Sequence, residues 1–442
     1  MNINKIRIYI VGLVVLMSLP QTGCIKEYLD PSSISDTQVI STLDGLIGLV
    51  NGMQLRYSVG RQSPMYQGFS ASGLSTLEQK VLNLGNTDEV NLANGGSAVT
   101  AGNTIVAGLW TQSFLLIKES NRVLDNLNVT TNVNAQAVLQ GYGSMYKALA
   151  IGTLAAYFEK MPVTLGKSQA FITRDESLRQ AVTLLEGAEK SLAGATNAAE
   201  VNATTAKIVA GIDLKNTLVA LQARYNLMLK DYPKALAAAN KVDLTKKSGF
   251  RYDAVNTNPI YFVSYSNRNV LEPTNKAFGL PAALAPDAVD KRIDFYMNPV
   301  ASASVNLGFG FPRTNTSEIP VYLPGEIRLI KAECLAQTDV AAAITELNGV
   351  IKKKAADDAY GVGADIATGY TGAATKDAVL VEVYRQRCIE LAYSGLRFED
   401  SRRLGRPGPE APLATRERGR NYMPYPQTER DNNTSTPADP AN

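Results

Sequence analysis

Histidine is absent from the sequence, and its absence excludes several classes of function at once. Without an imidazole the chain cannot build a Ser-His-Asp triad, a histidine-ligated zinc site or a histidine general base. Any catalysis would therefore depend on carboxylates, Lys, Tyr or Ser.

Cysteine is scarce, since the chain has only Cys24, Cys334 and Cys388. There is no CxxC pair, which excludes the zinc and thioredoxin-like motifs that need one. Cys334 in "KAECLAQ" and Cys388 in "RQRCIEL" fall in apolar helical patterns, so we expect two small buried side chains. The sequence leaves a disulfide between them open.

The sequence also lacks a large net charge, and it lacks long hydrophobic runs after its first 24 residues. The net charge of +3 is too small to indicate a nucleic acid or an acidic partner. After residue 24 no run is apolar and long enough to span a membrane. What remains is an ordinary globular composition, 45% hydrophobic over 442 residues, which is enough for a large core.

The first 24 residues are typical of a secretory signal. Lys5 and Arg7 precede an apolar run over 8–19 that is too short to cross a bilayer. Thr22 and Gly23 then precede Cys24, which resembles a bacterial lipobox, although Gln21 stands where Leu is usual. We expect a signal peptide over 1–23 and a lipid-anchored Cys24. An ordinary signal peptide with a chance cysteine is the alternative.

Helical periodicity recurs along the mature chain, while strand-like alternation is scarce. The helix over 137–163 should stop just before Pro162. The segments 216–242 and 325–355 are patterned as tetratricopeptide-type helical hairpins, which must stack to bury their apolar faces. The expected helices cover these segments: 46–59, 109–127, 137–163, 176–194, 216–242 and 325–355.

Loop-rich segments interrupt the helices. We expect a helical scaffold over about 105–242 and 324–404, with loop-rich insertions over about 60–105 and 245–322. Such insertions often carry recognition. The tail 405–442 is rich in Pro and charge, so we expect it to lack regular structure, with about the last ten residues disordered.

The stretch "RQRCIELAYSGLRFEDSRRLGR" over 385–406 carries closely spaced charges among apolar residues: Arg387, Glu390, Arg397, Asp400 and Arg403. Spacing of three predicts the pairs Arg387–Glu390, Arg397–Asp400 and Asp400–Arg403. Gly395 would let the chain turn. We expect a structural ionic lock, because carboxylates paired with arginines are poor general acids. A catalytic cluster and a partner-facing role are the alternatives.

The chain resembles the SusD/RagB-like outer-membrane lipoproteins of Bacteroidetes at many points. The matching segments are "CIKEYLDPSS", "NTDEV", "LWTQSFLLIKESNRVLDNL", "YKALAIGTLAAYFEKMPV", "ARYNLMLKDYPKALAAANKV", "LIKAECLAQ" and the charged stretch. In that stretch Gln386 and Ser394 replace two acids of the family signature. The resemblance implies a mainly α, SusD-like fold over 24–442, in which stacked tetratricopeptide-type hairpins carry a loop-rich, ligand-facing lobe.

The resemblance also implies a non-catalytic lipoprotein of the cell outer membrane, exposed at the surface. It would capture nutrient oligomers, above all oligosaccharides, and deliver them to a SusC-like TonB-dependent transporter. Sugar capture needs aromatic faces and polar side chains, and we expect them among these loop residues: Tyr66, Phe69, Asn91, Asn94, Tyr261, Tyr265, Asn267, Arg268 and Phe295. No motif carries this list, and packing within the loops is the alternative for each residue.

Three other functions remain open. A receptor of the same type could bind peptides. A surface glycosidase needs two carboxylates about 5 to 9 Å apart, and the loops offer Asp88, Glu89, Asp287 and Asp290. A repeat adaptor would bind only proteins. We expect no cofactor beyond the lipid on Cys24 and no metal, since "NTDEVNLANGG" lacks the spacing of a calcium loop.

Overall fold

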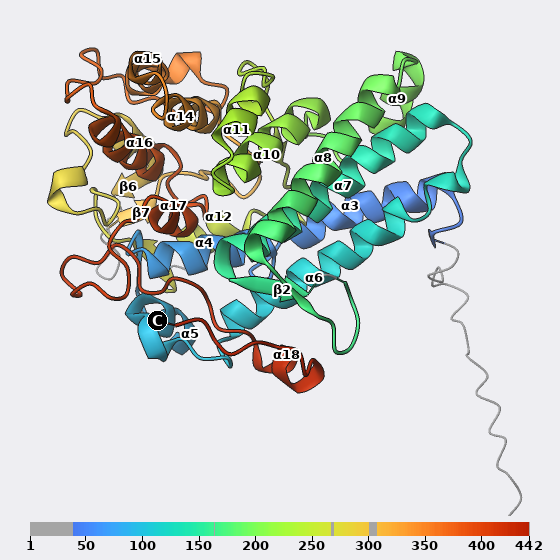
Figure 1. Ribbon diagram of the computed structural model, residues 1–442, viewed down its shortest axis with the longest axis horizontal. Coiled ribbons are helices and arrows are strands. Elements are labelled where there is room, and N and C mark those ends of the chain that lie inside the picture. Colours follow the sequence, from blue (N-terminus) through green and yellow to red (C-terminus); the bar gives the residue numbers. More distant parts are fainter. Residues whose placement is uncertain (1–38, 163, 267–268, 300–306, 442) are drawn as a thin grey trace, which may run out of the picture.

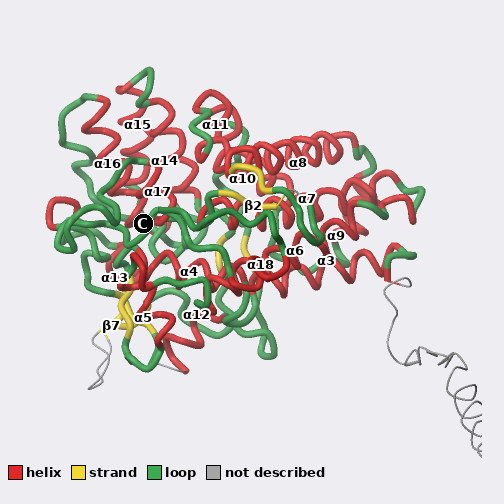
Figure 2. The backbone as a smooth tube through the Cα atoms, turned by 60° about the horizontal axis from the view of Figure 1, so that its bottom comes forward, coloured by secondary structure: helices red, strands yellow, loops and turns green. Residues whose placement is uncertain are grey.

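The computed structural model describes residues 39–441 except 163, 267–268 and 300–306 (Figure 1). The expected signal peptide and Cys24 lie outside the described residues. Within them, helices dominate and strands are few and short (Figure 2), which confirms the expected mainly α class. None of the described helices has both the length and the apolar character needed to cross a membrane.

The first part of the scaffold is a row of long helices packed side by side (Figure 1). They are α3 (Leu43–Ser58), α6 (Thr104–Leu124), α7 (Val133–Tyr157) and α8 (Arg174–Gly194). Helix α8 starts with a capping box formed by Thr173 and Glu176, which satisfies backbone donors at its first turn. Helix α7 ends at Tyr157, earlier than Pro162 requires, because the chain turns into β2 (Lys160–Pro162).

Helical hairpins continue the row. Helix α10 (Leu214–Met228) packs on α8 and on α11 (Tyr232–Ala239), and α11 packs on α14 (Pro324–Leu335). Helices α15 (Val340–Ile351) and α16 (Lys376–Glu390) cover α14, and the short α17 (Arg397–Arg403) follows. The two expected hairpins are present, each with its turn near the predicted place. Helix α9 (Ala198–Thr205) adds a short element beside α7.

The segment 245–323, which we call the loop-rich lobe, has only short elements. These are α12 (Pro259–Tyr261), a π-helical turn (Phe262–Ser266), a 3₁₀ turn (Ala282–Leu284), α13 (Arg292–Tyr296), β4 (Gly249–Phe250), β5 (Leu271–Pro273), β6 (Met297–Pro299), β7 (Leu307–Phe309) and β8 (Ile319–Pro320). Every strand pairing found among the described residues is an antiparallel pair: β1 (Gln79–Val81) with β5, β2 with β3 (Phe171–Thr173), β4 with β8, and β6 with β7.

The expected loop over about 60–105 is wrong in large part. Residues 64–75 form α4 and residues 87–94 form α5, with bounds Pro64–Ser75 and Thr87–Asn94. Nearly all of α4 is buried, including its serines and glycines, because it lies between α6, α17 and the strand β1. A helix that is buried on every side shows no amphipathic stripe in its sequence.

The expected disorder of about the last ten residues is also wrong, because Asn433 is buried and donates to the carbonyl of Gln169, and Asp439 accepts from the backbone N–H of Tyr425. The tail contains a short helix, α18 (Gln427–Asn432), and both Met423 and Tyr425 are fully buried. The indole Nε1 of Trp110 donates to Glu429 at 3.2 Å, and Arg430 pairs with Asp439 at 2.5 Å. Most of the tail lacks regular structure, as expected, but its contacts fix it along the scaffold (Figure 1).

Candidate functional site

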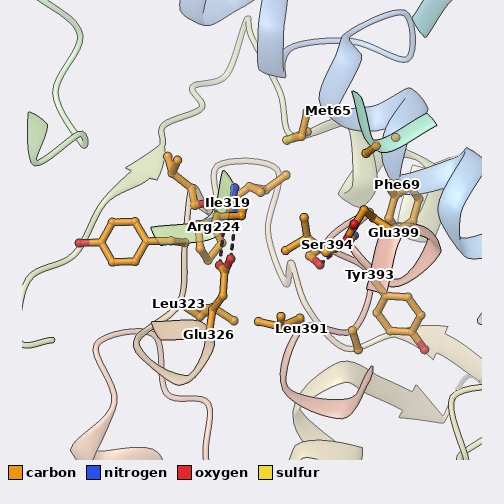
Figure 3. A pocket seen from close by; sticks show the side chains of 18 of the residues that line it. Met65, Phe69, Arg224, Ile319, Leu323, Glu326, Leu391, Tyr393, Ser394 and Glu399 are labelled. Carbon is orange, nitrogen blue, oxygen red and sulfur yellow. Dashed lines mark hydrogen bonds and ion pairs between the residues drawn. The ribbon is translucent and has the colours of Figure 1, made fainter. Parts of the chain in front are cut away.

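A cavity of about 150 Å³ lies where the helical scaffold meets the loop-rich lobe (Figure 3). The scaffold lines it with residues of α4, α7, α10, α14 and α17 and with the turn 391–396. The lobe closes the other side with α13 and with residues of 311–323. Sites between two structural units are a common place for ligands.

One wall of the cavity is apolar and aromatic. Phe295 of α13 stacks on Phe311, with ring centroids 5.2 Å apart and an interplanar angle of 22°. Both rings are half-buried, and Tyr360 beside them is half-buried as well. Met65 and Leu391 approach the cavity from the scaffold (Figure 3). Such ring faces can pack against the C–H surface of a sugar.

Another part of the lining contains a buried ion pair. The guanidinium of Arg224 on α10 donates two hydrogen bonds to Glu326 on α14, at 2.6 and 2.7 Å (Figure 3). It also donates to the carbonyl of Val321 at 2.7 Å. The neighbouring Glu326 carboxylate raises the pKa of Arg224 against the effect of burial. This bidentate geometry ties the two hairpins together beside the lobe.

A larger network, the scaffold cluster, continues from this wall. Its members are Arg174, Glu333, Arg387, Glu399, Asp400 and Arg403. Asp400 accepts from Arg387 at 2.8 Å and from Arg403 at 2.7 Å. Arg403 also contacts Glu333 and Glu399, and Arg174 binds Glu399 at 2.7 Å. The cluster joins helices α14, α16 and α17 with the start of α8 and has equal numbers of positive and negative groups.

A second network, the lobe cluster, ties the loop-rich lobe to α16. Its members are Asp290, Arg292, Lys353, Asp358, Gln386 and Glu390. Arg292 is fully buried and binds Asp290 at 2.7 Å, Glu390 at 3.0 Å and Gln386 at 2.6 Å. Lys353 contacts Glu390 at 2.5 Å and Asp358 at 2.6 Å.

The expected pairing within the stretch 385–406 is correct at one place only. Asp400 and Arg403 pair as predicted. The predicted pair Arg387–Glu390 is wrong, because Arg387 binds Asp400 and Glu390 binds Arg292 and Lys353. The predicted pair Arg397–Asp400 is wrong too, because the guanidinium of Arg397 donates to the carbonyls of residues 278 and 279.

The turn between α16 and α17 forms part of the cavity wall. Tyr393 adopts a left-handed backbone conformation (φ 62°), which is unusual for a bulky residue. Gly395 is also left-handed (φ 83°) and lies against the backbone of Gly68, where a Cβ would be 3.2 Å from the nearest atom. The backbone N–H of Tyr393 donates to Glu78 at 3.1 Å. Gly395 thus allows the turn that the sequence predicts there.

The aromatic residues predicted to bind ligand fall in different places. Phe69 and Phe295 both line the cavity. Tyr66 and Phe69 were expected in a loop, which is wrong: both lie on α4 and are buried, so Tyr66 offers no open ring face. Tyr261 ends α12 and is half-buried, outside the cavity lining. Tyr265 lies in the π-helical turn.

The polar residues predicted to bind ligand do not meet at the cavity either. Asn91 and Asn94 lie on α5, away from the cavity lining, with Asn94 exposed at the end of the helix. Asn267 and Arg268 lie outside the described residues. Their role in binding stays a prediction.

Sequence patterns missed several cavity residues. Phe311 and Tyr360 lie in irregular segments with no periodicity to mark them. Arg224 and Glu326 did carry a signal, since each is a charged residue inside an apolar helical pattern, "LQARYNLM" and "PGEIRLI". Such a residue needs a buried partner, but the sequence does not say which one.

Carboxylates near the cavity are bound to arginines. Glu326, Glu399 and Asp400 line it and each accepts from at least one guanidinium. The carboxylates considered for glycoside hydrolysis do not line it: Asp88, Glu89, Asp287 and Asp290. Asp287 binds Arg385 and Asp290 binds Arg292. A general acid needs a carboxyl that can hold and release a proton, which such pairing opposes.

The two described cysteines do not line the cavity. Cys334 and Cys388 are buried free thiols, and burial raises the pKa of each to about 12, so neither is a ready nucleophile. In the part of the chain that the structure describes, no group of three or more cysteine or acidic side chains is arranged to hold a metal ion.

Comparison with known proteins identifies the architecture. A family model described as the SusD family matches residues 252–441. A SusD superfamily protein from Bacteroides thetaiotaomicron is similar over 90% of this chain and 100% of its own, with a TM-score of 0.69 and 15% identity. This chain has the SusD fold. The expected resemblance and fold class are thereby confirmed.

Two other solved structures are similar to the SusD-fold chain. One is a SusD-like carbohydrate binding protein from Bacteroides fragilis, with a TM-score of 0.65, 15% identity, and coverage of 90% of this chain and 99% of its own. The other is a SusD-like carbohydrate binding protein from Bacteroides vulgatus, with a TM-score of 0.62, 15% identity, and coverage of 83% and 84%. No curated protein matches the chain.

Proposed function

We propose that this protein is a non-catalytic receptor that captures oligosaccharides or polysaccharides at the cell surface. The proposal rests on the SusD fold, which this chain shares over 83% and 90% of its length with two proteins that are described as carbohydrate binding. The family model over 252–441 supports it independently of the structure.

The cavity has the chemistry that sugar capture requires. The stacked Phe295 and Phe311 offer ring faces next to polar groups of the scaffold, and rigid aromatic faces bind at a small cost in conformational entropy. The buried carboxylates there are bound to arginines, which favours binding over hydrolysis.

The proposal includes a cellular location and a partner protein. Cys24 carries a lipid anchor that holds the mature chain at the outer membrane, and the protein delivers its ligand to a SusC-like TonB-dependent transporter. The lipobox-like "TGC" and the apolar run before it support the anchor. Incorporation of a tagged palmitate that is lost on Cys24→Ala tests the anchor, and co-purification of a barrel protein from detergent-solubilised membranes tests the partner.

The binding test uses the soluble chain from Ile25 to the C-terminus. It is screened against polysaccharides and mixed peptides by affinity gels and then calorimetry. We expect one glycan class to bind, and Phe295→Ala to weaken that binding by about tenfold or more, since about 1.4 kcal/mol corresponds to tenfold. Phe262→Ala is the matched control, because Phe262 is an exposed phenylalanine of the same lobe that does not line the cavity.

Peptide capture is the second outcome of this test. Binding of peptides with no retardation by any glycan, also with the transporter present, contradicts the sugar proposal and favours a peptide receptor of the same type. Glycan binding that Phe295→Ala leaves unchanged keeps the function but moves the site away from the cavity.

A further inference from the structure

Charged groups surround the cavity, and every one of them has a partner. Three arginines line it, Arg224, Arg387 and Arg403, and so do three acids, Glu326, Glu399 and Asp400. Arg224 is paired with Glu326, Arg387 with Asp400, and Arg403 with both Glu399 and Asp400. Behind the lining, the scaffold cluster also contains Arg174 and Glu333, which add one positive and one negative charge.

This balance determines what the cavity can hold. The lining guanidinium and carboxylate groups already form ion pairs and balance one another, so a ligand with a carboxylate, a sulfate or an ammonium group would bring an additional, unbalanced charge into a mainly apolar space. Burying such a charge is unfavourable unless it is paired. A neutral ligand with hydroxyl groups carries no such cost and can contact the rings of Phe295 and Phe311.

The size of the cavity limits how much of a glycan it can hold. Its volume of about 150 Å³ corresponds to on the order of ten water positions. That is room for roughly one or two sugar rings. Scaffold helices border it on one side and the loop-rich lobe on the other, and a space of this volume holds only a short part of a polymer.

We infer that the cavity receives the end of an uncharged glycan and discriminates against glycans whose terminal unit is charged. The inference rests on the proposed sugar capture and adds to it a ligand class and a direction of entry. Arg224 and Glu326 determine the specificity, because their mutual bidentate bond leaves neither charge available to a ligand.

The first experiment compares matched ligands on the wild-type chain. Neutral trisaccharides of glucose, xylose and mannose are measured by calorimetry beside versions that carry a terminal glucuronate or glucosamine. We expect the best neutral ligand to bind at least tenfold more tightly than its charged versions at pH 7. Equal affinities overturn the inference, while a failure of every glycan to bind overturns the proposed function instead.

A cyclic glucan tests the direction of entry, because it has no chain end. If linear glucans bind, the cyclic compound should bind at least tenfold more weakly. Equal binding would show that the site takes the middle of a chain and would contradict entry by the end.

The second experiment changes the charge balance. Glu326→Gln keeps the size of the side chain but leaves Arg224 without its carboxylate, so the ratio of affinities for the glucuronate and neutral ligands should rise at least tenfold. Glu346→Gln is the control, since Glu346 pairs with Arg328 on the outside of the hairpin. An unchanged affinity ratio in a folded Glu326→Gln protein contradicts the role of Arg224 and Glu326 in specificity. The comparison of neutral and charged trisaccharides on the wild-type chain tests the inference even if this variant does not fold.

Discussion

The scaffold cluster and the lobe cluster differ in the elements they join and in how far the sequence reveals them. The scaffold cluster links helices that lie side by side, and one of its contacts, Asp400–Arg403, follows helical spacing. The lobe cluster joins α16 to residues of an irregular segment almost one hundred positions away, and no spacing predicts it. Arg387 and Glu390 are three residues apart on α16 yet serve different clusters.

The difference shows what decides the partner of a buried charge. On a solvated helix face, residues three or four apart are each other's nearest candidates. On a buried helix, other elements approach more closely than the next turn does. Arg292, which is fully buried, reaches Glu390 from α13 and takes the place that Arg387 would have filled.

The largest expected effect comes from removing Arg292. Arg292→Met leaves Asp290 without any bonded cation and leaves Glu390 with Lys353 alone. Breaking a buried pair in this way costs about 3–5 kcal/mol. In urea denaturation, Arg387→Met should cost less, because Asp400 keeps Arg403. An equal or larger loss for Arg387→Met would contradict the view that the lobe cluster depends on one arginine.

A carboxyl outside both clusters provides the next test. Glu78 is buried and accepts a hydrogen bond from the Tyr393 N–H, and no Lys or Arg among the described residues forms an ion pair with it. Burial raises the pKa of Glu78 to about 7, although Arg397 lies near enough to oppose this. A carboxyl with a raised pKa holds its proton more tightly in the folded state. Its contribution to stability is therefore complete below about pH 4.5 and is lost as the pH rises through about 7.

Glu78→Gln should remove this dependence on pH. The variant should gain stability relative to the wild type between pH 5 and pH 8, by up to about 3 kcal/mol, since one pKa unit corresponds to 1.36 kcal/mol. Thermal and urea unfolding at several pH values measure the difference. A difference that stays constant from pH 5 to pH 8 would show that Glu78 is ionised throughout.

The smallest effect is expected at a pair on the surface. Arg328 binds Glu346 at 3.0 Å, and the two side chains are 37% and 22% exposed. Arg328→Gln should change the free energy of unfolding by less than about 1 kcal/mol. A loss as large as that of Arg292→Met would mean that burial does not separate the clusters from ordinary surface pairs.

The amphipathic helices could be predicted from the sequence, but a helix that is buried on all sides, and so has no single apolar face, could not. Helix α6 alternates buried and exposed residues with helical spacing, and the predicted segment 109–127 begins five residues late and ends three residues late. Helix α4 was missed because glycines and serines are buried along with its aromatic residues. The cavity was missed for a related reason, since Phe311 and Tyr360 come from irregular segments that only the packed lobe brings together.

The sequence by itself determined the mainly helical class, the stacked hairpins, the absence of histidine chemistry and the resemblance to the SusD family. These depend on composition and on periodicities that span a few turns, which are local properties of the chain. Only the tertiary structure decided which charges pair, where the tail lies and which rings face the cavity. Those contacts join residues far apart in sequence. Residue spacing alone allows several partners for each charged side chain, and the packing of the buried elements decides which of them it binds.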